Sequence, residues 1–205
     1  MTINKQELKE IRYFLFLDLE ATCCEDNLFP PSEMEIIEIG AFILDQNFTV
    51  LDQFNEFVKP FRHPALTPFC TELTSITQRD VDSAYNFSVV AKKLENWLTG
   101  YTDYAFCSWG KYDQKQFELD SNRHGVRNPV SNATCFINLK QLFAKQQRIG
   151  KQCGLARAMY LAELEMQGRN HRAIDDAKNM VQLASYTLGV EKIDPVKRAA
   201  YRKKS

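Results

Sequence analysis

The stretch Tyr13-Phe14-Leu15-Phe16-Leu17-Asp18-Leu19-Glu20-Ala21-Thr22 combines an apolar run with two acids near its end. An apolar run of this length, bounded by polar residues, is typical of a central strand covered on both faces. Asp18 and Glu20 stand two residues apart, so in an extended chain their side chains point to the same face. At the end of a buried strand these carboxylates repel each other unless a cation or hydrogen-bond donors neutralise them. Taken alone, the pattern favours two solvated acids at a strand end, and further carboxylates are needed to indicate a site.

The bulk composition is that of an ordinary globular protein. The 205 residues suffice for one sizeable core, and 26 basic against 26 acidic residues give a net charge of zero. Six cysteines without a C-x-x-C pair favour reduced thiols over a zinc site or a disulfide framework. The N-terminal segment lacks the apolar centre of a signal peptide, and no apolar run approaches a membrane span. We therefore expect a cytoplasmic protein without membrane contact.

The order of predicted elements indicates an α/β fold. We expect an N-terminal lead-in at 1–10, a main domain at 11–190 and a loose, basic C-terminal tail at 191–205. After the first strand, strands are predicted at 35–44, 48–58, 103–108 and 134–137. Helices are predicted to start near Thr77 and to cover 86–99, 113–124, the segment from 139 to 143, 152–165 and 172–188. A hairpin pair followed by alternating strands and helices indicates a mixed five-stranded sheet flanked by helices.

Two more acids are candidates for the edge where Asp18 and Glu20 lie. Asp113 follows the strand-to-loop transition at 108–110, although a helix N-terminal acid would have the same position. On a helical wheel of 174–188, Asp176 falls at the edge of the apolar half, so it needs a partner. Asp175 falls on the opposite side with Asn179, and we expect it to be solvated. Asp176 is therefore the candidate on this helix.

His171 is a candidate base because of its place ahead of the last long helix. It stands five residues before Asp176, about 140° away on an ideal helix. Both side chains can reach one site only if His171 lies in the preceding loop, and Gly168 and Asn170 are typical of a loop. A lone histidine is more often a surface or structural residue, but four candidate acids nearby favour a titrating base.

The four acids have the chemistry of a hard-metal site. Carboxylates without a thiolate or imidazole cluster favour Mg²⁺ or Mn²⁺ over zinc. Two such ions about 3.5–4 Å apart are a common device for in-line displacement at phosphorus. We therefore expect two Mg²⁺ ions as cofactors, with Mn²⁺ able to replace them.

The motifs resemble those of the DEDDh exonucleases, which have an RNase-H-like fold. The residues that carry the resemblance are DLEATC at 18–23, EIIEIGA at 35–41, FVKP at 57–60, LTPFCTELTSIT at 66–77, SWGKYD at 108–113 and HRAIDDA at 171–177. These motifs are most similar to those of the branch that contains the histone-mRNA 3' exonuclease and the enhanced-RNAi exoribonucleases. The resemblance covers roughly residues 11–190, which makes that segment an exonuclease domain.

The resemblance implies a role for each matched residue. Asp18 would bridge two metals, Glu20 and Asp176 would complete the first metal site, and Asp113 would hold the second. His171 would deprotonate the attacking water and contact the substrate, so that 5'-mononucleotides leave from a 3' end. The resemblance also places the terminal nucleotide of a single strand against a further set of residues, namely Ala21, Thr22, Leu73, Ile76 and Trp109. Ala21, Thr22 and the 73–76 region could equally be core.

The resemblance leaves the substrate open. The DLEATC and WGKYD motifs favour RNA as the substrate, whereas a DNA-directed 3'-5' exonuclease is the first alternative. An inactive nucleic-acid-binding protein on the same fold is the second, and the filled catalytic positions argue against it. The sequence has no counterpart of the N-terminal binding module of the histone-mRNA enzyme, so we expect broad 3' trimming. Protein partners stay unknown.

Overall fold

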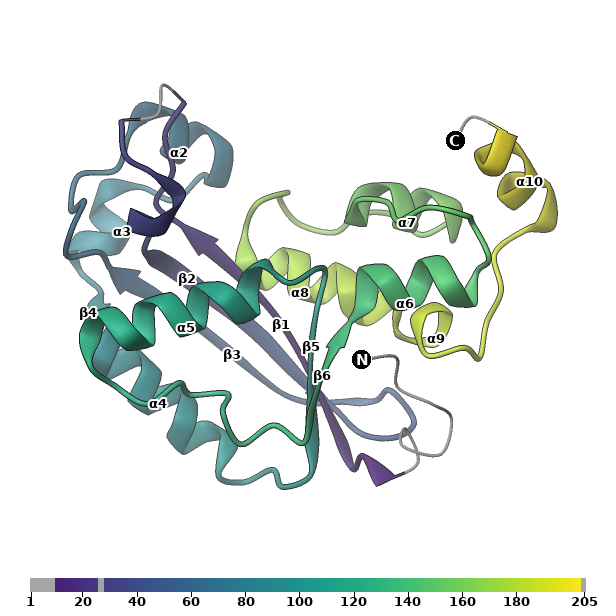
Figure 1. Ribbon diagram of the computed structural model, residues 1–205, viewed down its shortest axis with the longest axis horizontal. Helices are drawn as coiled ribbons and strands as arrows, with labels where there is room; N and C mark the ends of the chain where they lie inside the picture. Colours follow the sequence, from purple (N-terminus) through teal and green to yellow (C-terminus); the bar gives the residue numbers. More distant parts are fainter. Residues whose placement is uncertain (1–9, 26–27, 204–205) are drawn as a thin grey trace.

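The computed structural model describes residues 10–25 and 28–203, and its central feature is one mixed β-sheet (Figure 1). In this described part of the chain the sheet has six strands in the order β4-β3-β2-β1-β5-β6. β2 pairs antiparallel with both β1 and β3, whereas β5 runs parallel to β1 and to β6. The strands are β1 (Tyr13–Ala21), β2 (Ile36–Leu44), β3 (Val50–Lys59), β4 (Tyr85–Asn86), β5 (Tyr104–Ser108) and β6 (Cys135–Asn138).

The predicted strands are all present, and the α/β class with a mixed sheet is confirmed. The turn between β2 and β3 is a hairpin, in which the Asp45 carboxylate accepts hydrogen bonds from the N–H groups of Asn47 and Thr49. The expected number of five strands was one too few. The sixth, β4, pairs only two residues with the end of β3, so it is too short to give a sequence pattern.

The helices lie on both sides of the sheet, and they depart from prediction in three places. The helices are η1 (Pro31–Glu33, a 3-10 turn), α2 (Pro68–Thr74), α3 (Gln78–Asp82), α4 (Phe87–Leu98), α5 (Tyr112–His124), α6 (Leu139–Gln146), α7 (Leu155–Leu161), α8 (Ala173–Gln182), α9 (Ala184–Thr187) and α10 (Pro195–Lys203). Among the described residues, no helix is both long enough and apolar enough to cross a membrane.

Local capping chemistry explains these helix ends. α2 was not predicted, because the prolines before it indicated loop, yet Pro68 is its first residue and Thr67 caps it. The predicted start of α3 is confirmed, since Thr77 and Asp80 form a capping box. The helix expected at 172–188 divides at Leu183 into α8 and α9. The tail, expected to be loose, contains α10, while the predicted lead-in at 1–10 lies almost wholly outside the described residues.

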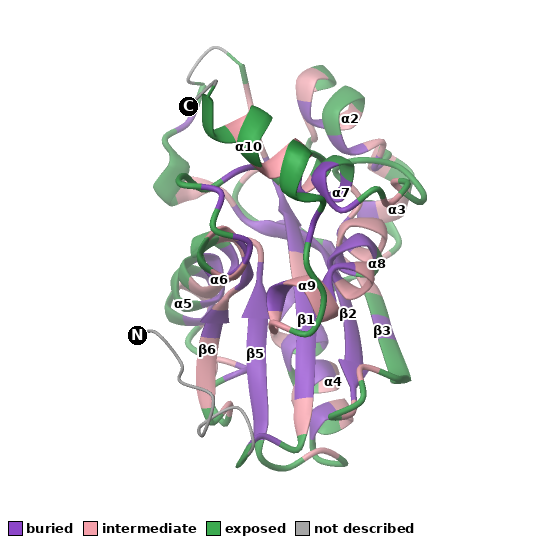
Figure 2. Ribbon diagram, turned by 90° about the vertical axis from the view of Figure 1, so that its right-hand side faces the viewer, coloured by how far each residue is buried: buried purple, intermediate pink, exposed green. Residues whose placement is uncertain are grey.

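Alternate residues of β1 pack into two different layers of core. Leu15 and Leu17 pack with α4 and α5, whereas Phe14 and Phe16 pack with α6 and α8. Burial on both faces explains why the strand is apolar at nearly every position (Figure 2). Asp18 and Glu20 continue the series of Phe14 and Phe16. The alternation therefore directs both acids toward the layer that contains α8.

Gly40 lets the start of α8 lie directly on the sheet. It stands opposite Asp18 in the β1–β2 pairing. A Cβ at this position would come within 2.2 Å of the Ile174 backbone nitrogen and 2.3 Å of the Ala173 carbonyl carbon. Because no side chain could fit there, glycine is required for this close approach. The first turn of α8 is thereby held above the end of β1, where Asp18 and Glu20 lie.

Candidate active site

The five residues predicted to form the site come from four separate segments. Asp18 and Glu20 lie near the end of β1, and Asp113 is the second residue of α5, which follows β5. Asp176 lies in the first turn of α8. His171 lies in the loop ahead of α8, as predicted, with a positive φ of 59°. Parallel pairing of β1 with β5 brings the first two segments to the same edge of the sheet.

Distances and hydrogen bonds show that these segments converge. Ligand atoms of Glu20, His171 and Asp176 all lie within 4.8 Å of one another. The Asp176 carboxylate accepts a hydrogen bond of 3.0 Å from the backbone N–H of His171. The Asp113 carboxylate accepts one of 3.1 Å from the backbone N–H of Leu19, between the two acids of β1. The loop, both helices and the strand therefore form one cluster.

The electrostatics of the cluster are those of crowded, desolvated acids. Burial, followed by the charges of Asp113, Glu20 and Asp176, raises the pKa of Asp18 well above its usual range. Burial raises the pKa of Glu20 to about 8, with the charge of Asp176 as the next cause. Burial raises the pKa of Asp113 to about 6 against opposing hydrogen bonds, and burial also raises that of Asp176. Such a set binds a cation favourably, because the cation supplies the missing opposite charge.

Two neighbours of the site, Glu38 and Arg172, were not singled out from the sequence. Glu38 is fully buried and stands opposite Glu20 in the β1–β2 pairing. Its carboxylate accepts two hydrogen bonds of 3.0 Å from the Arg172 guanidinium and one of 3.0 Å from the Ala173 N–H. This pair ties β2 to the residue between His171 and α8. An acid within the apolar run at 35–44 was the available signal, because a buried acid needs a partner.

Asp175 and Asn179 lie on a side of α8 that a loop covers. Asn179 is fully buried, and its amide bonds both the N–H and the carbonyl of Gln167. Asp175 is half-buried and accepts a hydrogen bond of 2.9 Å from the Arg169 N–H. Only Asp175 was expected to be solvated, and it is half-buried because the loop at 163–172 folds back over this side of the helix. These contacts fix the loop that carries His171.

The candidate substrate-binding residues occupy varied environments. Leu73 is 37 % exposed on α2, and Trp109 is half-buried, with its indole N–H donating to the Cys153 carbonyl at 3.1 Å. Thr22 is buried, and its hydroxyl accepts a hydrogen bond from the Glu35 N–H. Ala21 is buried beside the site, and Ile76 is fully buried in a core cluster with Cys70. Of these residues, Leu73 has the most accessible side chain.

The fold brings a cluster of carboxylates to one edge of the sheet, and comparison with known proteins gives the family of the chain. Residues 15–184 match the family model described as Exonuclease, RNase_T. The chain belongs to this exonuclease family. The solved nuclease domain of 3'hExo, described as a DEDDh family member bound to rAMP, is 27% identical with a TM-score of 0.76. That comparison covers 90% of this chain and 96% of the other. The resemblance to the DEDDh branch is thereby confirmed.

Curated relatives lie in the same branch. ERI1 exoribonuclease 3 of Mus musculus is 34% identical over 179 residues, which are 83% of this chain and 52% of the relative. The 3'-5' exoribonuclease 1 of Rattus norvegicus is 31% identical over 182 residues, which are 84% of this chain and 52% of the relative. The chain thus spans about half the length of these relatives.

Proposed function

We propose that this protein is a metal-dependent 3'-5' exoribonuclease that releases 5'-mononucleotides from single-stranded 3' ends. The observation that carries the proposal is the convergence of Asp18, Glu20, Asp113 and Asp176 around one edge of the sheet, with His171 beside them. The relatives described above are named exoribonucleases, which favours RNA over DNA as substrate. No residue of the site is assigned to a 2'-hydroxyl, so the RNA preference rests on those names.

The residues present fit a pair of hard divalent cations. All four acids offer carboxylate oxygens, the ligands that Mg²⁺ and Mn²⁺ prefer. Among the described residues, no lysine or arginine lies within ion-pair distance of any of the four. Asp18, Glu20 and Asp176 would hold one ion, and Asp18 and Asp113 the other. When bound, such ions lower the pKa of water and neutralise charge on the leaving oxygen.

His171 supplies the proton acceptor in this proposal. Its side chain is exposed, and its backbone is held by the bond from its N–H to Asp176. An exposed imidazole beside the proposed metal ions can take a proton from an attacking water. Arg172 and Glu38 act as positioning residues, because their ion pair fixes the chain directly after His171.

A time course on matched oligomers tests the proposal. Purified protein is incubated with 5'-labelled single-stranded RNA, duplex RNA and the corresponding DNAs, with Mg²⁺, with Mn²⁺ or with EDTA. We expect single-stranded RNA to shorten one nucleotide at a time from its 3' end in either metal, with no cleavage in EDTA. Faster degradation of DNA would support the DNA-directed alternative. Binding without any cleavage in Mn²⁺ would support the inactive nucleic-acid-binding alternative.

A further inference from the structure

The C-terminal segment, predicted to be a loose basic tail, is docked on the molecule as α10. Ile193 is buried, and its N–H donates to the Gln147 side chain at 3.0 Å. The Asp194 carboxylate caps the helix by accepting from the N–H groups of Val196 and Lys197. Tyr201 packs against the core cluster formed by α6 and α7. The helix therefore holds its basic side chains at fixed places, at the end of the molecule opposite α2 and α3 (Figure 1).

Docking of α10 places Arg202 at the side of an open cavity with cationic walls. The cavity has a volume of about 590 Å³, lies between α10 and the end of α6, and is lined by Gln141, Ala144, Lys145, Arg148, Gly150, Lys151, Gln152 and Arg202. Four of these residues are cations and none is acidic. Within the described part of the chain, no acid lies within ion-pair distance of any of the four. In a chain with a net charge of zero, this is a strong local concentration of positive charge.

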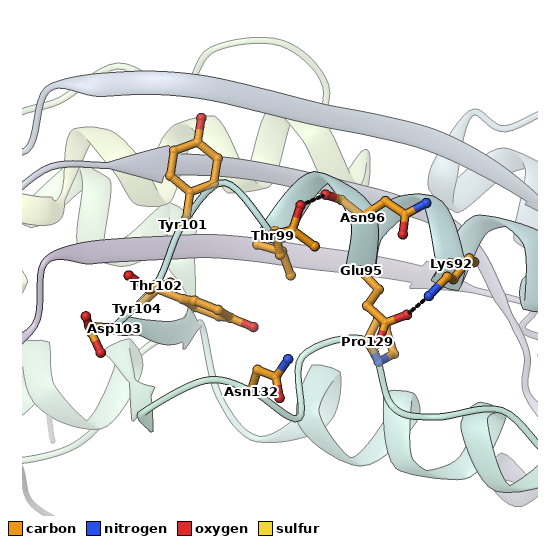
Figure 3. Close-up of a pocket in the computed structure, with 11 residues that line it drawn as sticks. Lys92, Glu95, Asn96, Thr99, Tyr101, Thr102, Asp103, Tyr104, Pro129 and Asn132 are labelled. Atoms are coloured by element: carbon orange, nitrogen blue, oxygen red, sulfur yellow. Dashed lines mark hydrogen bonds and ion pairs between the residues drawn. The ribbon is translucent and has the colours of Figure 1, made fainter.

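A second hollow of similar size shows what an ordinary cavity of this protein contains. It has a volume of about 570 Å³ and lies between α4 and the segments that flank β5 (Figure 3). Its lining includes the acids Glu95 and Asp103 and a single cation, Lys92, which is bonded to Glu95. Its two acids outnumber its one cation, so this hollow has no excess of positive charge. The α6–α10 cavity differs from this hollow because its charged lining residues are all cations.

The cationic cavity is connected to the candidate active site by one short segment. Lys151 lines the cavity, and two residues later the Cys153 carbonyl accepts the hydrogen bond from Trp109, which follows β5 four residues before Asp113. Burial raises the pKa of the Cys153 thiol to about 11, and the nearby charges of Lys140 and Arg157 oppose this rise. Two further cations, Lys140 and Arg157, thus lie near Cys153.

The chemistry of the cavity fits a polyanion with regularly spaced charges. Lys and Arg without acidic partners bind phosphates and release counterions from them. Lys151 of the cavity lies 6.0 Å from the ring centroid of Tyr201, which also has Arg157 at 5.7 Å. Cations interleaved with aromatic rings are typical of single-strand binding surfaces. We propose that the α6–α10 cavity binds the phosphate backbone of the single strand whose 3' end lies in the candidate active site. This inference rests on the proposed function and adds a second contact, upstream of the terminal nucleotide.

The salt dependence of binding tests the inference without requiring catalysis. The test variant combines Lys145→Gln, Arg148→Gln and Arg202→Gln, three exposed cations of the cavity. The matched control combines Lys59→Gln, Lys92→Gln and Arg127→Gln, three exposed cations elsewhere. Fluorescence anisotropy in EDTA measures affinity for single-stranded RNA of about 20 nucleotides, long enough to span both sites. A charge-keeping variant, Arg148→Lys with Arg202→Lys, separates loss of charge from loss of fold.

Counterion release sets the expected size of the effect. Each lost phosphate contact lowers the slope of log K against log salt by about 0.7 for a single strand, so three contacts lower it by about 2. The same slope corresponds to about 10²-fold weaker binding at about 0.1 M salt. We expect this change in the test variant only, with the charge-keeping variant close to the unaltered protein. Equal slopes in the test and control variants would overturn the inference.

A hydrolysis assay separates failure of the inference from failure of the proposed function. In Mn²⁺, we expect the test variant to raise KM for the long RNA and to leave hydrolysis of a trinucleotide unchanged, because the proposed contact lies upstream of the terminal nucleotides. An equal loss on both lengths would contradict the inference while the exonuclease activity stands. Absence of hydrolysis by every variant, including the unaltered protein, would instead remove the proposed function. The binding slopes would then still decide whether the cavity binds RNA.

Discussion

Two sets of buried acids lie close together in this molecule, and they differ in what neutralises them. The partnered set consists of Glu35, Glu38 and Asp120. Glu35 accepts three backbone N–H groups from residues 61–63, Glu38 is bonded to Arg172, and Asp120 is bonded to Arg123 and to the Ile36 N–H. The unpartnered set consists of Asp18, Glu20, Asp113 and Asp176. Among the described residues these four have no lysine or arginine within ion-pair distance, and Asp113 and Asp176 each accept one backbone hydrogen bond from the site.

The difference teaches how to tell structural acids from functional ones. A buried acid with a cation or several donors contributes to the fold, because its charge is already compensated. Acids that crowd together without compensation destabilise the fold, and they are retained where function requires them. Glu20 and Glu38 show this difference directly, because they stand opposite each other in the sheet and only Glu38 has a cationic partner. The experiments that follow change members of each set, from the largest expected effect to the smallest.

Removal of a charge from the unpartnered set should abolish activity and stabilise the metal-free fold. Asp18→Asn deletes a ligand required by the proposed centre, so we expect no detectable hydrolysis of RNA in Mn²⁺. In EDTA we expect a higher melting temperature, because burial and four neighbouring carboxylates disfavour the charge that is removed. Activity assays and thermal melts of the same preparations measure both effects. Turnover equal to that of the unaltered protein would refute the assigned site.

The imidazole beside the unpartnered acids should matter for rate and little for stability. His171→Ala should lower kcat by about 10²–10⁴-fold, as expected for loss of a general base. The side chain is exposed, so we expect an unchanged melting temperature. Rates of the variant and of the unaltered protein across a pH series measure the loss. A full rate at every pH would assign His171 to the loop structure alone.

A change in the partnered set should have the opposite sign for stability. Glu38→Ala leaves Arg172 without its carboxylate and the Ala173 N–H without an acceptor. We expect the free energy of unfolding to fall by about 3 kcal/mol, as is typical when one partner of a buried ion pair is removed. Urea unfolding measures the loss. In a double-mutant cycle with Arg172→Met, most of the loss should be recovered, and purely additive losses would show that the pair is not coupled.

Metal binding should cancel the repulsion within the unpartnered set. At about 100 times its dissociation constant, a cation that binds only the folded state adds about 2.7 kcal/mol to the free energy of unfolding. For a chain of this size that amounts to a rise in melting temperature of about 5–10 °C. Titration with Mn²⁺ during thermal melts measures it. Asp18→Asn should lose most of the rise and Glu38→Ala should keep it, so an equal rise in all three proteins would place the metal elsewhere.

The sequence predicted most of the fold and the site because both follow local patterns. The run at Tyr13–Ala21, the capping residues Thr77 and Asp80, and the wheel position of Asp176 each have one physical reading. The roles of the site residues stay predictions that the variants above test. The resemblance to DEDDh exonucleases, rather than residue spacing alone, joined the four acids into one set.

What the sequence did not predict depends on contacts between distant segments. The Glu38–Arg172 pair joins residues 134 positions apart, and no local pattern indicates it. Asn179 is polar and was placed on the solvated side of α8, because the wheel does not include the loop that covers it. The helix α10 contains no buried residue and few apolar residues, so composition alone indicated a loose tail. Tertiary contacts decide all three cases.

Asp52 has hydrogen-bond partners but is exposed, so it separates the effect of partners on stability from the effect of burial. Asp52 on β3 accepts hydrogen bonds of 2.9 Å from the Trp97 indole N–H and 3.1 Å from the Tyr101 hydroxyl. The Trp97 bond, with help from Gln53 N–H and Tyr101, lowers the pKa of Asp52. Its stabilising effect is therefore present above the unfolded pKa of about 3.9 and is lost as pH falls through the lowered folded value.

Because water competes at an exposed site, Asp52→Asn should cost less than about 1 kcal/mol of unfolding free energy at pH 7. Urea unfolding at pH 7 and pH 3 measures this loss and its decrease with acid. A loss of unfolding free energy as large as that of Glu38→Ala would show that hydrogen-bond partners alone, without burial, determine how much an acid stabilises this fold.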